Sequence, residues 1–267
     1  MLRFFLNALK TLVGRRYLIY TMARREVASN YVGSLLGVIW TFIHPVVLIT
    51  VFWVVFSLGF RVRPMKDVPF VVWLTAGMSA WFAFSEMVAG AVGSVVANGN
   101  LVKRTLFPSQ VLPVVKIFSS LANHAAFILV LFVLIVLQRM PLSFYYLQAL
   151  YYLVCMMVLA VGLGWMFSAL NVFIRDVGQV VGVALQIGFW ATPIFWDARI
   201  MPARLQQYLK LNPLYYIVQG YRDSFIYFVP FWQRPYLTAY FWSVALVILL
   251  LGAMVFKRLQ PQFSDAL

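Results

Sequence analysis

The side chains that could carry chemistry are few in this sequence, and they form no catalytic pattern. No lysine follows a glycine, so a Gly-Lys-Ser/Thr phosphate loop is absent and we expect no ATPase site in this chain. The two histidines, His44 and His124, have no clustered carboxylates nearby that would complete a metal site. The acidic residues occur singly, as Glu26, Asp67, Glu86, Asp176, Asp197, Asp223 and Asp265. The sequence therefore predicts a protein that is not an enzyme and holds no metal or cofactor.

Two polar side chains interrupt long apolar runs. A lone carboxylate such as Glu86 is costly inside a bilayer, so we expect it to face a partner or a watery cavity. It is either a channel or gate residue or a protonated group that bonds a neighbouring helix. His124 has the same two interpretations, with helix packing favoured. Trp40 is a further candidate for the wall of a channel.

Composition places the chain in a membrane. Hydrophobic residues make up 64% of the 267, charged residues only 10%, and the mean hydropathy is +0.89. A soluble domain carries about a quarter charged residues. The net charge of +14 comes mostly from lysines and arginines between apolar runs, where they can contact membrane lipids. Nucleic-acid binders instead gather such residues on a polar face, so we expect no nucleic-acid partner.

The apolar runs define the elements that must position these side chains. Each run offers the ~20 residues that cross a ~30 Å hydrocarbon layer as a helix. The sequence therefore predicts an all-α membrane protein with six transmembrane helices, over residues 38–60, 70–92, 112–137, 145–172, 177–196 and 236–256.

Six spans place both termini on one side of the membrane. With the termini in the cytoplasm, twelve basic residues lie inside and nine outside, and six of the twelve precede the first span, where they weigh most. We therefore expect both termini in the cytoplasm. The whole chain, 1–267, reads as one integral permease domain, with a cytoplasmic or interfacial segment 1–37, a transmembrane region 38–256 and a cytoplasmic tail 257–267.

Two segments look like helices that lie along the cytoplasmic face. Residues 2–13 have an apolar and a polar side at helical spacing, which predicts an amphipathic helix in the membrane interface. Between the second and third spans, Asn98–Pro113 places basic residues beside apolar ones. We interpret it as a short amphipathic helix that fits a groove on a partner, or else as an interfacial linker.

Residues 197–235 are too interrupted to be a simple loop or a span. The apolar stretch from Leu214 to Val229 carries Arg222 and Asp223 near its middle, and prolines flank it on both sides. Its many aromatic residues are typical of contact with lipid headgroups. We therefore predict a re-entrant or interfacial helical hairpin on the outer side.

Several segments together resemble a known family, the membrane subunit of ABC-type polysaccharide exporters, which includes the O-antigen and teichoic-acid permeases. Asn98–Pro113 (NGNLVKRTLFPSQVLP) is similar to the cytoplasmic coupling loop of that family. The other similar segments follow the family's order, as Arg24–Pro45 (RREVASNYVGSLLGVIWTFIHP), Asn171–Gln179 (NVFIRDVGQ), Ala191–Asp197 (ATPIFWD) and Leu211–Asp223 (LNPLYYIVQGYRD).

The resemblance implies partners and a transport function. The chain would form a homodimer in the bacterial inner membrane and dock on two copies of an ATP-binding cassette subunit, which would hold the ATP and magnesium. It would move an undecaprenyl-diphosphate-linked polysaccharide, first of all O-antigen, out of the cytoplasm as part of lipopolysaccharide biosynthesis.

The resemblance also implies roles for particular residues. Those that would couple to the ATPase are Asn100, Leu101, Lys103, Arg104, Leu106 and Phe107. Those at the entrance for the diphosphate would be Arg24, Arg25 and Tyr31, and those at the exit Tyr215, Tyr216, Arg222 and Asp223. Arg24 and Arg25 could equally bind anionic lipid headgroups. Teichoic acid, capsule, drugs or other lipids are alternative substrates, and a membrane-embedded glycan or lipid enzyme is a less favoured alternative.

Overall fold

The computed structural model describes residues 10–29, 34–62, 68–104 and 107–267, and these residues form helices and turns without a strand. Within these described residues, five helices are long and apolar enough to cross a membrane, namely Gly37–Gly59, Phe70–Ala97, Val111–Leu137, Phe144–Phe173 and Pro235–Ala266. These five match five of the six predicted spans. The chain is therefore an all-helical membrane protein.

The remaining predicted span, 177–196, is only partly helical. Helix α8 covers Asp176–Ala191, which is 16 residues and about 24 Å at ~1.5 Å per residue. It ends because Thr192 adopts an extended backbone before Pro193, as residues before proline do. Helix α8 is thus shorter than a typical span, and the count of six is not settled by helix length.

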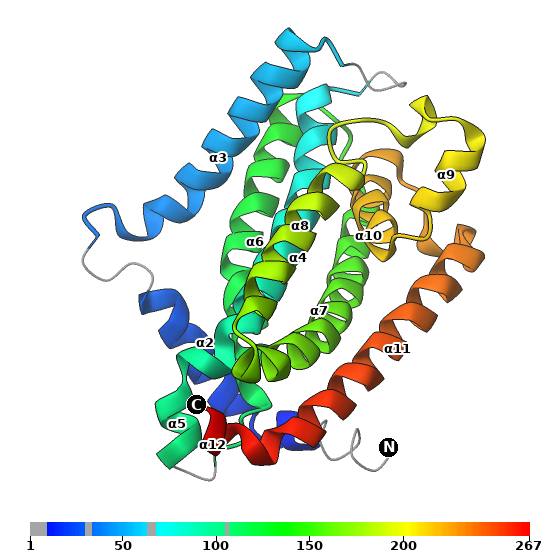
Figure 1. Ribbon diagram of the computed structural model, residues 1–267. Coiled ribbons are helices and arrows are strands. Elements are labelled where there is room, and N and C mark those ends of the chain that lie inside the picture. Colours follow the sequence, from blue (N-terminus) through cyan, green and yellow to red (C-terminus); the bar gives the residue numbers. More distant parts are fainter. Residues whose placement is uncertain (1–9, 30–33, 63–67, 105–106) are drawn as a thin grey trace.

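The core of the bundle is built around one buried helix. Helix α4 (Phe70–Ala97) packs along α6 (Val111–Leu137) and α7 (Gln148–Phe173), and α11 (Pro235–Leu259) packs along α7. Helix α3 (Trp40–Trp53), which the π-helical turn η2 (Val54–Gly59) extends, leans away from the bundle in Figure 1. Its apolar side chains are largely exposed, as a lipid-facing or partner-facing helix requires.

Glycines let α7 and α11 approach each other closely. A Cβ atom built on Gly252 would lie 2.0 Å from the carbonyl oxygen of Gly162, and one on Gly162 would lie 2.8 Å from the backbone of Leu249. Without a driving force from water, membrane helices associate through this kind of close backbone packing. The α7–α11 pair depends on both positions lacking a side chain.

The short helices gather at the two ends of the bundle. Helices α2 (Arg16–Ser29), α5 (Gly99–Arg104) and α12 (Phe263–Ala266) lie at one end, here called the α5 end, and α9 (Ala203–Leu209) and α10 (Pro213–Arg222) lie at the other, here called the α10 end (Figure 1). At the α5 end, Lys116 of α6 forms an ion pair with Glu26 of α2. The predicted cytoplasmic and outer elements therefore lie at opposite ends.

Candidate functional site

The segment predicted to couple to a partner contains a shorter helix than expected. Helix α5 covers Gly99–Arg104, six residues, and the next described residues, Phe107 and Pro108, are not helical. Asn100, Leu101 and Lys103 on it are exposed, and Leu101 keeps 41% of its surface accessible. An exposed leucine beside a lysine at the tip of a bundle suits contact with a second protein.

Two apolar residues of this segment face the protein. Phe107 is half-buried and packs, with Val102, on the apolar cluster beneath α5. Arg104 ends the helix, and Leu106 lies outside the described residues. A Cβ atom built on Gly99 would contact the side chain of Leu267, so the C-terminus supports α5 from below.

The predicted entrance residues lie on α2 at the same end. Arg24 and Arg25 are both exposed, and they follow Ala23, which is buried against the bundle. Tyr31, the third predicted entrance residue, lies outside the described residues, as do residues 1–9 of the predicted amphipathic helix. Residues 10–14, its last part, are helical.

Two of the predicted channel residues share a cavity. Glu86 and Trp40 line a cavity of about 460 Å³ between α3, α4 and α6, together with His44 and Asn123. Asn123 donates a hydrogen bond of 2.7 Å from Nδ2 to Oε1 of Glu86. The carboxyl group thus has a hydrogen-bond partner on a neighbouring helix and also borders a cavity, which fits both interpretations of Glu86.

His124 is not among the residues of that cavity. Its side chain is buried, and its Nε2 lies 3.0 Å from the hydroxyl oxygen of Tyr221 on α10. This contact joins α6 to the α10 helix across 97 residues of sequence. A contact of this kind between two helices is what the packing interpretation of His124 requires.

The α10 end holds a buried charge that the bundle surrounds. Arg222 is 2% exposed. Its Nη1 and Nη2 donate hydrogen bonds of 2.8 Å each to the carbonyl oxygens of Pro193 and Ile194, and its guanidinium lies over the ring of Trp73. Burial lowers the pKa of Arg222 to about 10, so it stays charged at neutral pH. A predicted exit residue therefore anchors α10 to α4 and to the end of α8.

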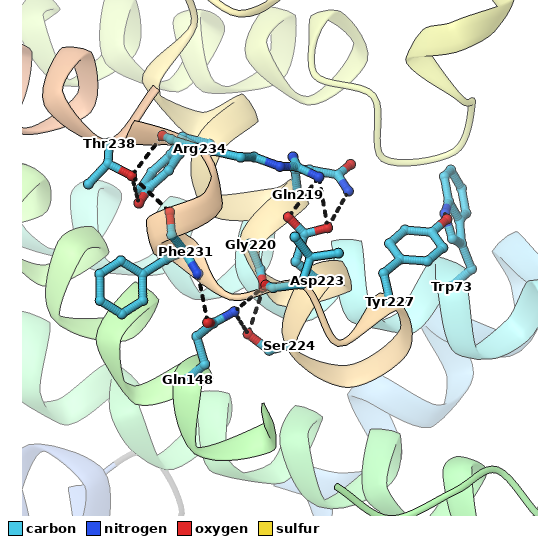
Figure 2. Close-up of polar contacts among 12 residues, drawn as sticks. Trp73, Gln148, Gln219, Gly220, Asp223, Ser224, Tyr227, Phe231, Arg234 and Thr238 are labelled. Atoms are coloured by element: carbon cyan, nitrogen blue, oxygen red, sulfur yellow. Dashed lines mark hydrogen bonds and ion pairs between the residues drawn. The ribbon is translucent and has the colours of Figure 1, made fainter. Parts of the chain in front are cut away.

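The neighbouring carboxylate is satisfied within its own segment. Asp223 begins the π-helical turn η5 (Asp223–Tyr227) and is buried. It accepts a hydrogen bond from Gln219 at 2.9 Å and an ion pair from Arg234 at 3.0 Å. Figure 2 shows the side chains of Gln219 and Arg234 meeting at the Asp223 carboxylate. Arg234 precedes α11, so the ion pair fixes the start of the last span.

Gln148 makes a second set of contacts that the sequence did not single out. It begins α7 and donates from Nε2 to the carbonyl oxygen of Val229 at 3.0 Å, while its Oε1 accepts from the backbone N–H of Phe231 at 2.9 Å (Figure 2). One amide therefore satisfies the backbone of the turn on both sides. The sequence alone could not predict these two contacts of Gln148, because Val229 and Phe231 lie more than 80 residues away from it.

The predicted exit tyrosines take different positions. Tyr216 is buried, and its hydroxyl group lies 3.1 Å from that of Tyr151 and 2.9 Å from Oγ1 of Thr238. Tyr215 is half-buried and lines a polar cavity of about 210 Å³ with Gln219, Arg222 and Asp223. Arg199, Arg234 and Asp197 complete its charged wall. The cavity can hold water or a small polar group.

Asp197 and Arg199 form an ion pair on this wall. Arg199 donates to Asp197 through its backbone N–H at 2.9 Å, Nε at 3.0 Å and Nη2 at 2.5 Å. Burial alone would raise the pKa of Asp197, but the hydrogen bonds and charge of Arg199 outweigh it and hold that pKa below its usual value. The pair stabilises the turn that follows α8.

The sequence is similar to known proteins over most of its length. The family model described as "ABC-2 type transporter" matches residues 17–226. The O-antigen export system permease protein RfbA of Klebsiella pneumoniae is 23% identical over 251 residues, which covers 94% of this chain and 95% of that protein. RfbA of Myxococcus xanthus is 24% identical over 255 residues, covering 94% and 96%. The polysialic acid transport protein KpsM of Escherichia coli is 22% identical over 201 residues, covering 75% and 78%.

Proposed function

Because the chain belongs to the ABC-2 type transporter family, we propose that it is the permease subunit of an ATP-driven exporter of polysaccharide in the bacterial inner membrane. The observation that carries this proposal is the match to O-antigen export permeases over 94% of the chain. The chain supplies the membrane path and is not itself the ATPase, as the relatives' description as permease proteins indicates. ATP and magnesium bind to a separate subunit.

The directions in which successive helices run favour six membrane crossings. Helix α7 runs toward the α5 end, and α11 also runs toward the α5 end (Figure 1). The chain between them must therefore return to the α10 end, and α8 makes that return. We propose that α8, with Thr192–Trp196 after it, is the fifth span, that both termini are cytoplasmic, and that α9 and α10 form an outer re-entrant hairpin.

The basic residues support this orientation. Helices α2, α5 and the end of α11 carry Arg24, Arg25, Lys103, Lys257 and Arg258, all at the α5 end. Positive charge gathers on the cytoplasmic side of membrane proteins. On this assignment α5, with Leu101 exposed, faces the ATP-binding subunit.

We propose a homodimer that docks on two ATP-binding subunits. The largely exposed apolar faces of α3 and α8 support a second copy at that side, since Val47, Val51, Val183, Ile187 and Trp190 are all at least half exposed. One path shared by two copies would be wider than the cavity beside Glu86. The entrance would lie near Arg24 and Arg25, and the exit near Tyr215 and the charged cavity.

The substrate that we propose is an undecaprenyl-diphosphate-linked polysaccharide, first of all O-antigen. The first relatives are O-antigen export permeases. Capsule is the second candidate, because the polysialic acid transport protein and the capsule polysaccharide export inner-membrane protein CtrC of Neisseria meningitidis also match.

The test is reconstitution with and without the partner. The chain alone in proteoliposomes should hydrolyse no ATP, and with its ATP-binding subunit it should hydrolyse ATP and move a lipid-linked glycan into the lumen. Gene deletion should leave that glycan on the cytoplasmic face. Robust ATP hydrolysis by the isolated chain, or an unchanged cell surface after deletion, would contradict the proposal.

A further inference from the structure

A large apolar groove lies behind α2, beside the proposed entrance, with which it shares Arg24. Its volume is about 680 Å³. One wall is the face of α2 with Ile19, Tyr20 and Val27, and the other wall comes from α6, α7 and α11, with Phe118, Val158 and Leu249. The groove is open at its side, so molecules of the surrounding membrane can reach it.

The groove has the length of a lipid chain. Along α7 its wall runs from Val154 to Trp165, which is about 16 Å at ~1.5 Å per residue. A methylene group is about as large as a water molecule, whose share of liquid volume is ~30 Å³, so 680 Å³ holds roughly twenty carbons. That is one acyl chain and the start of another, and far less than a whole undecaprenyl chain.

Two arginines give the rim of the groove a charge. Arg16 and Arg24 line it, both are exposed, and both belong to α2 at the α5 end. No carboxylate is among the described residues that line the groove. The one acidic residue of α2, Glu26, forms its ion pair with Lys116 instead. Guanidinium groups bind phosphate through paired N–H donors, so the rim suits the anionic head of a lipid.

We propose that this groove binds an anionic phospholipid of the membrane, with one acyl chain along α7 and its phosphate between Arg16 and Arg24. The lipid fills the space between α2 and the bundle and holds α2 against α6 and α7. The exposed faces of α3 and α8, which the proposed second copy would cover, contribute no residue to the groove. The site therefore does not depend on the proposed dimer, and Arg24 is the one residue that it shares with the proposed entrance.

The experiment measures the lipid bound to the purified, detergent-solubilised chain by native mass spectrometry, after exchange into phosphatidylglycerol or phosphatidylcholine. The wild-type chain should retain phosphatidylglycerol and not phosphatidylcholine. In the double variant R16E/R24E, the fraction of the chain with bound phosphatidylglycerol should fall at least tenfold. R15E/R25E is the matched control, because it makes the same charge change next to the same positions with side chains outside the groove, and it should retain the lipid.

A second pair of variants tests the apolar part. Val158→Trp fills the groove and should also expel the lipid, whereas Val133→Trp, which adds the same bulk on the exposed face of α6, should not. Circular dichroism identifies any variant that fails to fold, and the other pair then decides. Full occupancy in both R16E/R24E and Val158→Trp would overturn the proposal, and so would equal retention of phosphatidylcholine.

Two other occupants are distinguished by the same measurement. If residues 2–9 of the chain fill the groove, their deletion should create or increase phosphatidylglycerol binding, and that result would overturn the proposal. If the mass of a polyprenyl-diphosphate lipid replaces that of the phospholipid in cells that make the glycan, the groove serves the substrate and the proposal is wrong. Retained phosphatidylglycerol in both cases supports it.

Discussion

The guanidinium carbon of Arg222 lies 3.5 Å from the centroid of the Trp73 ring. Trp73 is in the first turn of α4 and Arg222 is the last residue of α10, so the contact joins the second span to the hairpin. Trp73 makes a second contact with the same region, because its indole N–H donates a hydrogen bond of 3.1 Å to the hydroxyl group of Tyr227. The hairpin is thus fixed to the bundle by a buried charge.

Removal of that charge should loosen the hairpin. In Arg222→Ala the carbonyl oxygens of Pro193 and Ile194 lose their donors, and the free energy of unfolding should fall by about 3 to 5 kcal/mol. Arg222→Lys keeps the charge but not the paired donors or the flat stacking surface, so we expect an intermediate loss. Unfolding titrations with SDS measure both. An Arg222→Ala chain as stable as the wild type would show that the contact contributes nothing.

Gly77 provides a test of the same site from the other side. A Cβ atom at this position would lie 2.8 Å from Nη2 of Arg222. Alanine in a helix is usually more stable than glycine by about 1 kcal/mol, but Gly77→Ala should be destabilising because the anchored guanidinium has little room to move. Gly93→Ala is the matched control on the same helix, since nothing lies within 4 Å of its Cβ position. Relative to the wild type, the thermal midpoint should fall in Gly77→Ala and rise in Gly93→Ala.

The sequence predicted five spans that the structure matches, but not the contacts between them. Long apolar runs predicted α3 with η2, α4, α6, α7 and α11 to within five residues at each end, because the need to satisfy every backbone group in lipid leaves only the helix. The fifth predicted span, 177–196, extends past helix α8, which ends at Ala191, because the apolar run continues through Thr192–Trp196 after the helix has ended. Hydropathy does not register a backbone that turns before a proline.

The sequence identified single residues of the site but not the residues that they contact. Arg222 and Asp223 were noticed as charges within an apolar stretch, which argued against a span and favoured a hairpin. Their burial could not be foreseen, because Trp73 lies 149 positions before Arg222 in the sequence. The interpretation of His124 depended in the same way on Tyr221, 97 residues away. A single sequence contains no record of such distant partners.

The α7–α11 crossing should be the least tolerant of added bulk. In Gly252→Ala the new methyl group would lie 2.0 Å from the backbone oxygen of Gly162, and backbone cannot move aside as a flexible side chain can. The two helices would have to separate, so we expect a loss of several kcal/mol or failure to accumulate in the membrane. Gly182→Ala on α8, with nothing within 4 Å, should accumulate normally. Yield and monodispersity after detergent extraction measure both.

Acidification should weaken the turn after α8. The pKa of Asp197 is held below its usual value of ~3.9 by Arg199, so the folded state favours the ionised carboxylate. Its stabilisation is complete above that usual value and is lost as the pH falls through the lower folded-state pKa. The thermal midpoint of Asp197→Asn should therefore lie below that of the wild type at pH 7, and the difference should shrink at pH 3. A difference that is constant with pH would contradict this assignment.

Leu101 tests the proposed coupling surface directly. It is 41% exposed on α5, so Leu101→Asp should leave the stability of the permease within about 0.5 kcal/mol of the wild type. If α5 inserts into the ATP-binding subunit, a buried charge at this anchor should weaken the contact, and glycan transport in proteoliposomes should fall by tenfold or more. Arg104→Glu, at the end of α5, should act in the same direction. Phe144→Asp, which places the same charge on a side chain that is 92% exposed at the α10 end, is the control and should transport normally. Normal transport by Leu101→Asp would mean that the ATP-binding subunit binds another part of the α5 end, such as α2 or α12, and not α5.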